Sequence, residues 1–172
     1  TGNTDTVYGS AFFDLQKTGP LVIEVPAGLG PGTVNDAYFR FVADTGGPGP
    51  DKGMGGKYLI LGPDDKEPAN TDGYFVFRSP TYSNWLILRA FLDEAGKPDK
   101  AIANYESGLR MYPLSQKDNP PKMTFIQGGE AVYNTVHANN FEFFVELNRV
   151  IQREPIDFLD PEIRGLASAI GL

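Results

Sequence analysis

The stretch VYGSAFFDL, residues 7–15, alternates apolar and polar side chains with a period of two. Val7, Ala11 and Phe13 fall on one face of an extended chain, whereas Ser10 and Asp14 fall on the other. This alternation predicts a half-buried β-strand rather than a helix.

Further segments with strand character follow up to Leu92, separated by turn-forming pairs such as Gly62-Pro63 and Asp72-Gly73. They are residues 21–25, 33–43, 58–61, 74–78 and 85–92. Because no helical pattern separates these strands, we predict an antiparallel β-sandwich over residues 1–96.

The period of the pattern changes after Gly96. Four apolar residues then recur at helical spacing and predict a helix that Pro113 ends: Ile102, Tyr105, Leu109 and Tyr112. Residues 123–126 resemble a short strand within an otherwise irregular segment. We therefore expect a mainly β protein with C-terminal helices, in which residues 97–172 form a helical segment packed on or beside the sandwich.

Two more helices are predicted near the C-terminus. In the first, residues 140–153, Asn139 is the expected N-cap and Glu142 completes a capping pattern. The second begins with Asp160 as N-cap and Pro161 at the first helical position, and ends at Gly171.

The composition limits the classes of function. Lys and Arg number 15 against 22 Asp and Glu, which gives a net charge of −7, and the basic residues are scattered along the chain. Nucleic acids and anionic membranes are therefore poor partners. No apolar run approaches the roughly 20 residues of a membrane-spanning helix, so we expect no membrane insertion.

Cofactor and metal sites are also disfavoured by the residue types present. The chain has no Cys and a single His, which excludes disulfides, zinc-thiolate sites and a metal centre of several histidines. We expect no cofactor and no metal.

A glycine-rich run, residues 46–56, has two possible interpretations: a phosphate-binding loop or a connection between strands. A Walker loop requires Ser or Thr after Gly-Lys, but Tyr58 follows Gly56-Lys57, and Asp51 occupies the position of the first glycine. We interpret the run as a loop between two strands.

The most distinctive polar constellation lies in the segment 33–43. If that segment is one strand, Asp36, Tyr38 and Arg40 project from the same face, opposite Ala37, Phe39 and Phe41. A carboxylate, a phenol and a guanidinium side by side suit sugar hydroxyls or a carboxylate ligand. The alternative is a set of cross-strand pairs on a solvated face or on a face covered by another domain.

His137 is the other candidate ligand-binding residue. It lies with Asn134, Asn139 and Asn140 in an expected loop before a helix, where functional side chains are often found. The alternative is a purely structural histidine.

Several short motifs together resemble the domain of unknown function 1254 family over nearly the whole chain. They are Asn3-Thr4-Asp5-Thr6-Val7-Tyr8, Gly19-Pro20-Leu21-Val22, Glu24-Val25-Pro26, the stretch 46–61, Arg78-Ser79-Pro80-Thr81, Tyr112-Pro113-Leu114 and Asn134-Thr135-Val136-His137. The resemblance implies an immunoglobulin-like antiparallel β-sandwich followed by helices, normally preceding a second, jelly-roll-like domain of unknown function 1214. It also implies a bacterial, exported protein, periplasmic or extracellular, of which this chain is a fragment without the leader and the second domain.

The family has no agreed chemistry that can be transferred to particular residues. Our first hypothesis is a non-catalytic module that contributes a binding or assembly surface, for a glycan or a polar small ligand. The alternative is the half-site of a glycan-directed hydrolase, with Asp36, Arg40 and His137 in a cleft completed by the second domain; a glycosidase requires two carboxyl groups about 5 to 10 Å apart. A third possibility is a structural role, in which the second domain or a partner chain covers exposed apolar surface.

Overall fold

The computed structural model describes residues 5–129, 134, 136–155 and 161–172. The chain divides into two compact units, Thr1–Met123 and Thr124–Leu172. The elements of the first unit are β1 (Thr6–Asp14), α1 (Leu15–Thr18), β2 (Leu21–Val25), β3 (Gly32–Asp36), β4 (Phe41–Thr45), β5 (Gly56–Leu61), β6 (Tyr74–Arg78), β7 (Ser83–Phe91), α2 (Asp99–Gly108), β8 (Arg110–Pro113) and the 3-10 turn η1 (Leu114–Gln116). Those of the second are α3 (Glu142–Arg153) and α4 (Pro161–Ala169).

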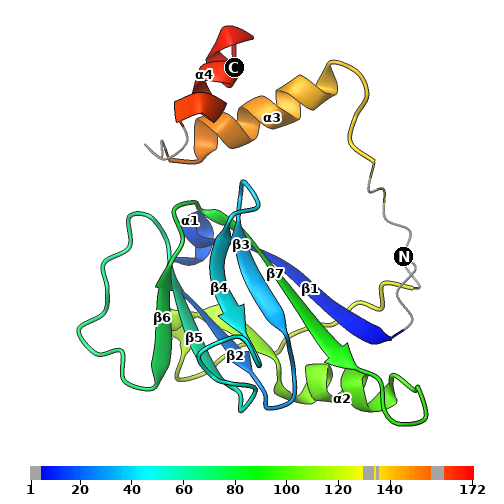
Figure 1. The fold of residues 1–172 in the computed structure, drawn as a ribbon. Coiled ribbons are helices and arrows are strands. Elements are labelled where there is room, and N and C mark those ends of the chain that lie inside the picture. Colours follow the sequence, from blue (N-terminus) through cyan, green and yellow to red (C-terminus); the bar gives the residue numbers. More distant parts are fainter. Residues whose placement is uncertain (1–4, 130–133, 135, 156–160) are drawn as a thin grey trace. The chain divides into compact units, whose positions relative to one another are not determined.

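The strands of the first unit form two four-stranded sheets, in the orders β1-β7-β3-β4 and β6-β5-β2-β8 (Figure 1). Pairing is antiparallel except between β5 and β6, which are parallel. Residues 62–73 make this parallel pair possible, since parallel neighbours need a connection of about a dozen residues. The prediction of a mainly β sandwich with helices near the C-terminus is confirmed.

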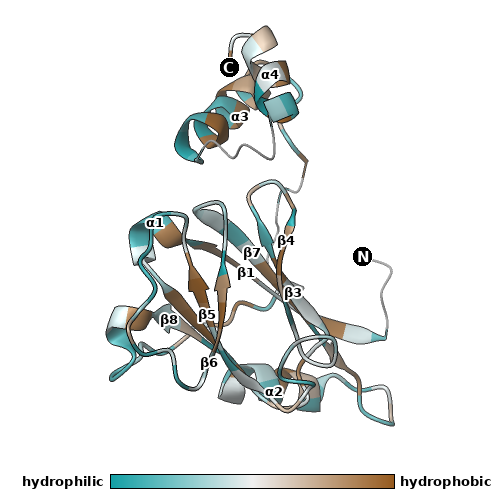
Figure 2. Cartoon of the chain, turned by 60° about the vertical axis from the view of Figure 1, so that its left-hand side comes forward, coloured by the Kyte–Doolittle hydropathy of each residue, from teal (hydrophilic) through white to brown (hydrophobic). Residues whose placement is uncertain are grey.

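In the sheet β6-β5-β2-β8, the central strands β2 and β5 are buried on both faces. Leu21 and Ile60 pair on one face, whereas Val22 and Leu59 pair on the other, and all four side chains are almost fully buried. Val22 and Leu59 form an apolar cluster with Leu61 and Tyr112. Accordingly, strands of this sheet carry hydrophobic residues without the alternation of a half-exposed strand (Figure 2).

The sheet β1-β7-β3-β4 is buried on one face only. Along β7, Leu86 and Leu88 are buried, whereas the intervening Trp85 and Ile87 are only partly buried and Arg89 is exposed. The second face of this sheet is therefore available for contact, and it carries the candidate site described below.

The prediction of one strand over residues 33–43 is wrong. β3 ends at Asp36 and β4 begins at Phe41, so the segment is a hairpin with its turn at residues 37–40. The alternation of apolar and polar residues continues through the turn, but the apolar side chain of Phe39 is exposed there and does not point into the core. Side-chain alternation alone does not reveal such a reversal of the chain.

The first predicted helix is too long. α2 ends at Gly108, and residues 110–113 form β8, where Tyr112 pairs with Val22 of β2. The last residue of α2 must be glycine, because a Cβ on Gly108 would lie 2.5 Å from the Pro26 Cβ. Tyr112 fits the helical spacing and the strand equally well, so the sequence pattern could not separate the two.

The second unit contains both remaining predicted helices. The expected cap at Asn139 is wrong: Phe141 is the N-cap residue of α3, and the side chain of Asn140 accepts a hydrogen bond from the Glu142 N–H. α4 ends at Ala169, two residues before the expected stop at Gly171, which lies in the following turn with φ of 82°. Asp160 lies outside the described residues. Residues 123–126 form no strand.

In the part of the chain that the structure describes, none of the helices has both the length and the apolar character needed to cross a membrane.

Candidate binding face

The outward face of the β1-β7-β3-β4 sheet is built from residues that the strand registers bring into rows. Phe12 lies opposite Trp85, which in turn lies opposite Asn35. In the next row, Ile87 pairs with Thr33. Because each step of two residues moves about 7 Å along a strand, the two rows are immediate neighbours on one surface.

Three aromatic rings gather at one end of this face, and we call them the aromatic platform: Phe12, Phe39 and Trp85. The ring centroids of Phe12 and Trp85 are 5.9 Å apart with an interplanar angle of 10°, and those of Phe39 and Trp85 are 5.3 Å apart. Phe12 is 81% exposed and Phe39 69% exposed. The Trp85 Nε1 donates to Ser10 Oγ at 2.7 Å, which fixes the orientation of the indole.

Phe39 is held in an unfavourable backbone conformation by the hairpin turn. Its φ is 65°, in the left-handed region that bulky side chains rarely occupy. The N–H of Phe39 donates to the Asp36 carbonyl at 3.0 Å, and the N–H of Asp36 donates to the Arg40 carbonyl at 2.9 Å. These two bonds close the turn and place the ring of Phe39 beside Trp85.

The carboxylate of Asp36 is the centre of that turn. Its Oδ1 accepts from the N–H groups of Tyr38 and Arg40 at 2.9 and 2.8 Å, and its Oδ2 accepts from Arg40 Nε at 2.7 Å. The side chain of Asp36 is 0% exposed. Thr81 steadies the turn from the neighbouring segment, since its Oγ1 accepts from the Ala37 N–H at 3.0 Å.

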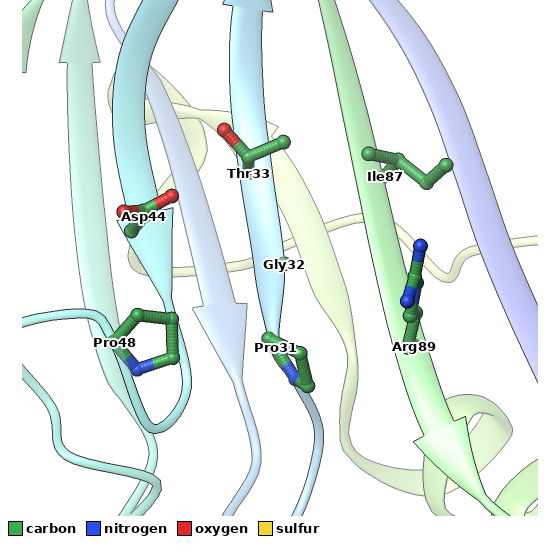
Figure 3. Close-up of a pocket in the computed structure, with 7 residues that line it drawn as sticks. All are labelled: Pro31, Gly32, Thr33, Asp44, Pro48, Ile87 and Arg89. Atoms are coloured by element: carbon green, nitrogen blue, oxygen red, sulfur yellow. The ribbon is translucent and has the colours of Figure 1, made fainter. Parts of the chain in front are cut away.

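A shallow hollow of about 250 Å³ adjoins the aromatic platform, and we call it the polar hollow. Figure 3 shows its lining residues: Pro31, Gly32, Thr33, Asp44, Pro48, Ile87 and Arg89. Asp44 on β4 and Arg89 on β7 stand on opposite sides of Thr33 (Figure 3). The guanidinium of Arg89 also lies 5.1 Å from the ring centroid of Tyr8, which supports the side chain from β1.

Of the residues singled out from the sequence, Asp36, Tyr38 and Arg40 do lie together. They occupy the hairpin turn rather than one strand face, and the guanidinium of Arg40 lies 5.4 Å from the Tyr38 ring centroid. Because the Asp36 carboxylate is buried and satisfied by three donors, its role is to hold the turn, and a ligand has no access to it.

His137 belongs to the second unit, apart from that turn in the chain. It is exposed, its Nδ1 lies 2.9 Å from the Ala138 carbonyl oxygen, and its ring packs on Phe143 with centroids 5.4 Å apart. A hollow of about 620 Å³ brings His137 together with the asparagines noted in the sequence and with one acidic residue: Asn134, Asn139, Asn140 and Glu146. All of its lining residues lie within the segment 134–146, so the hollow is formed within that segment alone.

The glycine-rich run connects β4 to β5, as the sequence predicts, and a strand rather than a helix follows it. Asp51 organises this loop from inside: its carboxylate accepts from the Gly55 N–H at 3.1 Å and from the Tyr58 hydroxyl at 2.5 Å. Burial, together with the hydrogen bond to Asp51, raises the pKa of the Tyr58 phenol well above its usual range. The loop has a structural explanation that requires no phosphate.

Within the described residues, no three His, Cys, Asp or Glu side chains gather in a way that could hold a metal ion.

The aromatic platform was missed by the sequence analysis, although one signal of it was present. In residues 7–15, Phe12 stands at a position of the polar face, between Ser10 and Asp14. An exposed aromatic residue on the polar face of a strand is the feature that marks such a surface. Asp44 gave no comparable signal, because only the sheet order β7-β3-β4 brings it together with Arg89.

Comparison with known proteins gives a family and a fold. Residues 1–113 match the family model described as protein of unknown function (DUF1254), and the match ends with the last residue of β8. A search of curated proteins found no match.

Among solved structures, the chain is similar to the crystal structure of the VPA0106 protein from Vibrio parahaemolyticus, with a TM-score of 0.58 and 16% sequence identity. The alignment covers 96% of this chain and 46% of that one, so this chain spans about half the length of VPA0106. At this identity the likeness shows the fold.

Proposed function

We propose that this chain, which belongs to the DUF1254 family of proteins of unknown function, is a non-catalytic binding module whose binding surface is the outward face of the β1-β7-β3-β4 sheet. The surface consists of the aromatic platform and the polar hollow. Exposed aromatic rings beside a few fixed polar groups are typical of ligand-binding surfaces.

Phe39 is the observation that carries the proposal. A left-handed backbone costs a residue with a Cβ about 1 to 2 kcal/mol, and the ring of Phe39 is too exposed for burial to offset that cost. Backbone strain of this kind is found mainly at functional sites. Contact with a ligand explains why an aromatic ring occupies this position, whereas stability of the fold does not.

The alternative hydrolase half-site receives less support from the geometry. Its carboxylate, Asp36, is buried and engaged by the turn, so it has no free oxygen for protonating or attacking a glycosidic bond.

Our proposal includes the setting that the family resemblance implies, namely an exported bacterial protein in the periplasm or outside the cell. A further domain would accompany the module there. The support for the further domain is that this chain spans 46% of the VPA0106 chain.

The test is a binding screen that compares the wild-type chain with a variant lacking the platform. The two immobilised proteins, wild type and the Phe12→Ala/Phe39→Ala double variant, are probed with arrays of glycans, peptides and small polar molecules. We expect ligands that bind the wild type and not the variant. Equal binding to both proteins, or no binding by either, would contradict the proposed function.

A further inference from the structure

We infer that the ligand of this face is a neutral pyranose oligosaccharide, whose sugar rings lie on the aromatic platform while its hydroxyl groups reach into the polar hollow. This inference rests on the proposed binding function and adds the chemical class of the ligand.

The platform offers what the apolar side of a sugar ring requires. A pyranose presents C–H bonds on its ring faces and hydroxyl groups around its edge. The rings of Phe12 and Trp85 are stacked, with planes 10° apart, and together with the neighbouring Phe39 they form an exposed apolar area against which those C–H bonds can pack.

The polar hollow offers what the sugar hydroxyls require. A hydroxyl group donates one hydrogen bond and accepts others, so it needs both kinds of partner. Asp44 supplies acceptors only and Arg89 supplies donors only, and they stand on opposite sides of Thr33 (Figure 3). The two charged groups can therefore bind different hydroxyls of one chain, with bonds strengthened by charge.

The length of the face indicates an oligomer rather than a single sugar. Trp85 and Arg89 are four residues apart on β7 and project from the same face, which corresponds to about 13 Å along the strand. A single ring cannot pack on the platform and contact Arg89 at once, whereas a chain of linked rings can.

The charges indicate a neutral chain. One carboxylate and one guanidinium flank the hollow, so the site has no excess of positive charge for a polyanion. The protein as a whole carries a net charge of −7, which repels acidic polysaccharides, nucleic acids and anionic lipid surfaces.

The sequence contains a single tryptophan, Trp85, and this makes the test specific for the site. The full chain is titrated with cellohexaose, mannohexaose and maltohexaose, with the intrinsic fluorescence of Trp85 and isothermal titration calorimetry as readouts. Hexagalacturonate, a polyproline peptide and phosphatidylcholine vesicles serve as probes of the competing classes. We expect a saturable response to at least one neutral hexasaccharide and none to the other three probes.

Variants then locate the bound sugar. Removal of one ring, by Phe12→Ala or Phe39→Ala, should weaken binding about tenfold, which is at the low end of the range measured for nucleobases stacked on aromatic side chains. Asp44→Asn and Arg89→Gln should each weaken it about threefold to tenfold. Phe141→Ala is the matched control, because Phe141 is 77% exposed and belongs to α3's N-terminal end in the second unit; its affinity should equal that of the wild type.

The outcomes separate the two proposals. If Trp85 responds to the peptide or the vesicles and to none of the sugars, the inferred ligand class is wrong while the binding function stands. If the acidic hexasaccharide binds more tightly than the neutral ones, the inferred neutrality is wrong. If sugars bind but the platform variants keep full affinity, the inferred site is wrong. If none of the probes gives a response, the result contradicts both the inferred ligand class and the binding function.

Discussion

At the scale of single residues, one buried carboxylate determines the shape of the candidate site. Asp36 accepts two backbone N–H groups and the guanidinium of Arg40, so the chain reverses within residues 37–40. This reversal forces Phe39 into the left-handed region and sets its ring against Trp85. Asp36, which the sequence suggested as a ligand-binding residue, therefore supports the binding surface by holding the turn.

The strain at Phe39 predicts an unusual order of stability between two variants. Phe39→Ala and Phe39→Gly both remove the ring contact with Trp85, but only alanine keeps the Cβ that disfavours a φ of 65°. We expect the glycine variant to be more stable than the alanine variant by about 1 kcal/mol. Chemical denaturation of both variants at neutral pH measures the difference.

The reference for that comparison is an ordinary extended position on the same face. At Phe12, in the middle of β1, the order should reverse, with Phe12→Ala more stable than Phe12→Gly by about 0.5 to 1 kcal/mol. If the alanine variant is more stable than the glycine variant at both positions, the inferred strain at Phe39 is disproved.

At the scale of elements, α2 is attached to the sandwich by a tyrosine that contacts β1. The Gly9 N–H donates to the Tyr105 hydroxyl at 3.2 Å, and that hydroxyl donates to the Val7 carbonyl at 3.3 Å. Glycine is required at position 9, because a Cβ there would lie 2.6 Å from the ring of Tyr105. Helix and strand therefore meet at a distance that only glycine allows.

The buried phenol makes stability sensitive to alkaline pH. Burial raises the pKa of Tyr105 to about 12 from 10.0, although the hydrogen bond from Gly9 opposes the shift. The unfolded chain loses this proton first, so the contribution of Tyr105 is complete below pH 10 and is lost as the pH rises through 12. Two pKa units correspond to about 3 kcal/mol.

Tyr105→Phe isolates that contribution. At pH 7 the variant should lose about 1 kcal/mol, since the Gly9 N–H is left without its acceptor. Between pH 9 and 12 its unfolding free energy should fall by about 2 to 3 kcal/mol less than that of the wild type. Urea denaturation across this range is the measurement, and parallel curves for the two proteins would show that Tyr105 does not titrate as inferred.

The elements also show where sequence patterns are sufficient. Alternation located β1, β2, β5, β6 and β7, because a half-buried or buried strand leaves a period or an apolar run in the sequence. It failed at residues 33–43 and 109–112, where one pattern fits two backbone paths. Hydrogen bonds to the Asp36 carboxylate decide the first path, and they depend on side-chain chemistry that periodicity does not describe. The pairing of β8 with β2 decides the second path, and it depends on residues distant in the chain.

At the scale of the whole molecule, the sandwich needs residues beyond its predicted end. Four side chains after residue 96 are buried in the first unit: Ala101, Tyr105, Leu109 and Tyr112. β8 also completes the sheet beside β2. The unit that can fold alone should therefore end near Met123 rather than at residue 96.

Two truncated chains test this boundary. Residues 1–123 contain every strand of both sheets, so we expect this fragment to unfold cooperatively in urea and to give the circular dichroism of a β protein. Residues 1–96 lack β8 and α2, which leaves β2 as an unpaired edge, and we expect no cooperative transition. The boundary is misplaced if the shorter fragment folds as well as the longer one.

Local patterns and motifs along the chain were sufficient to predict the fold class, the strands whose burial leaves a clear period, the two C-terminal helices and the family. The candidate site could not be predicted in this way, because its residues come from three segments that are separate in the chain: Phe12 from β1, Phe39 and Asp44 from the turn before β4 and from β4, and Trp85 and Arg89 from β7. A surface is defined by which strands pair and in which register, and hydrogen bonds between distant segments set both.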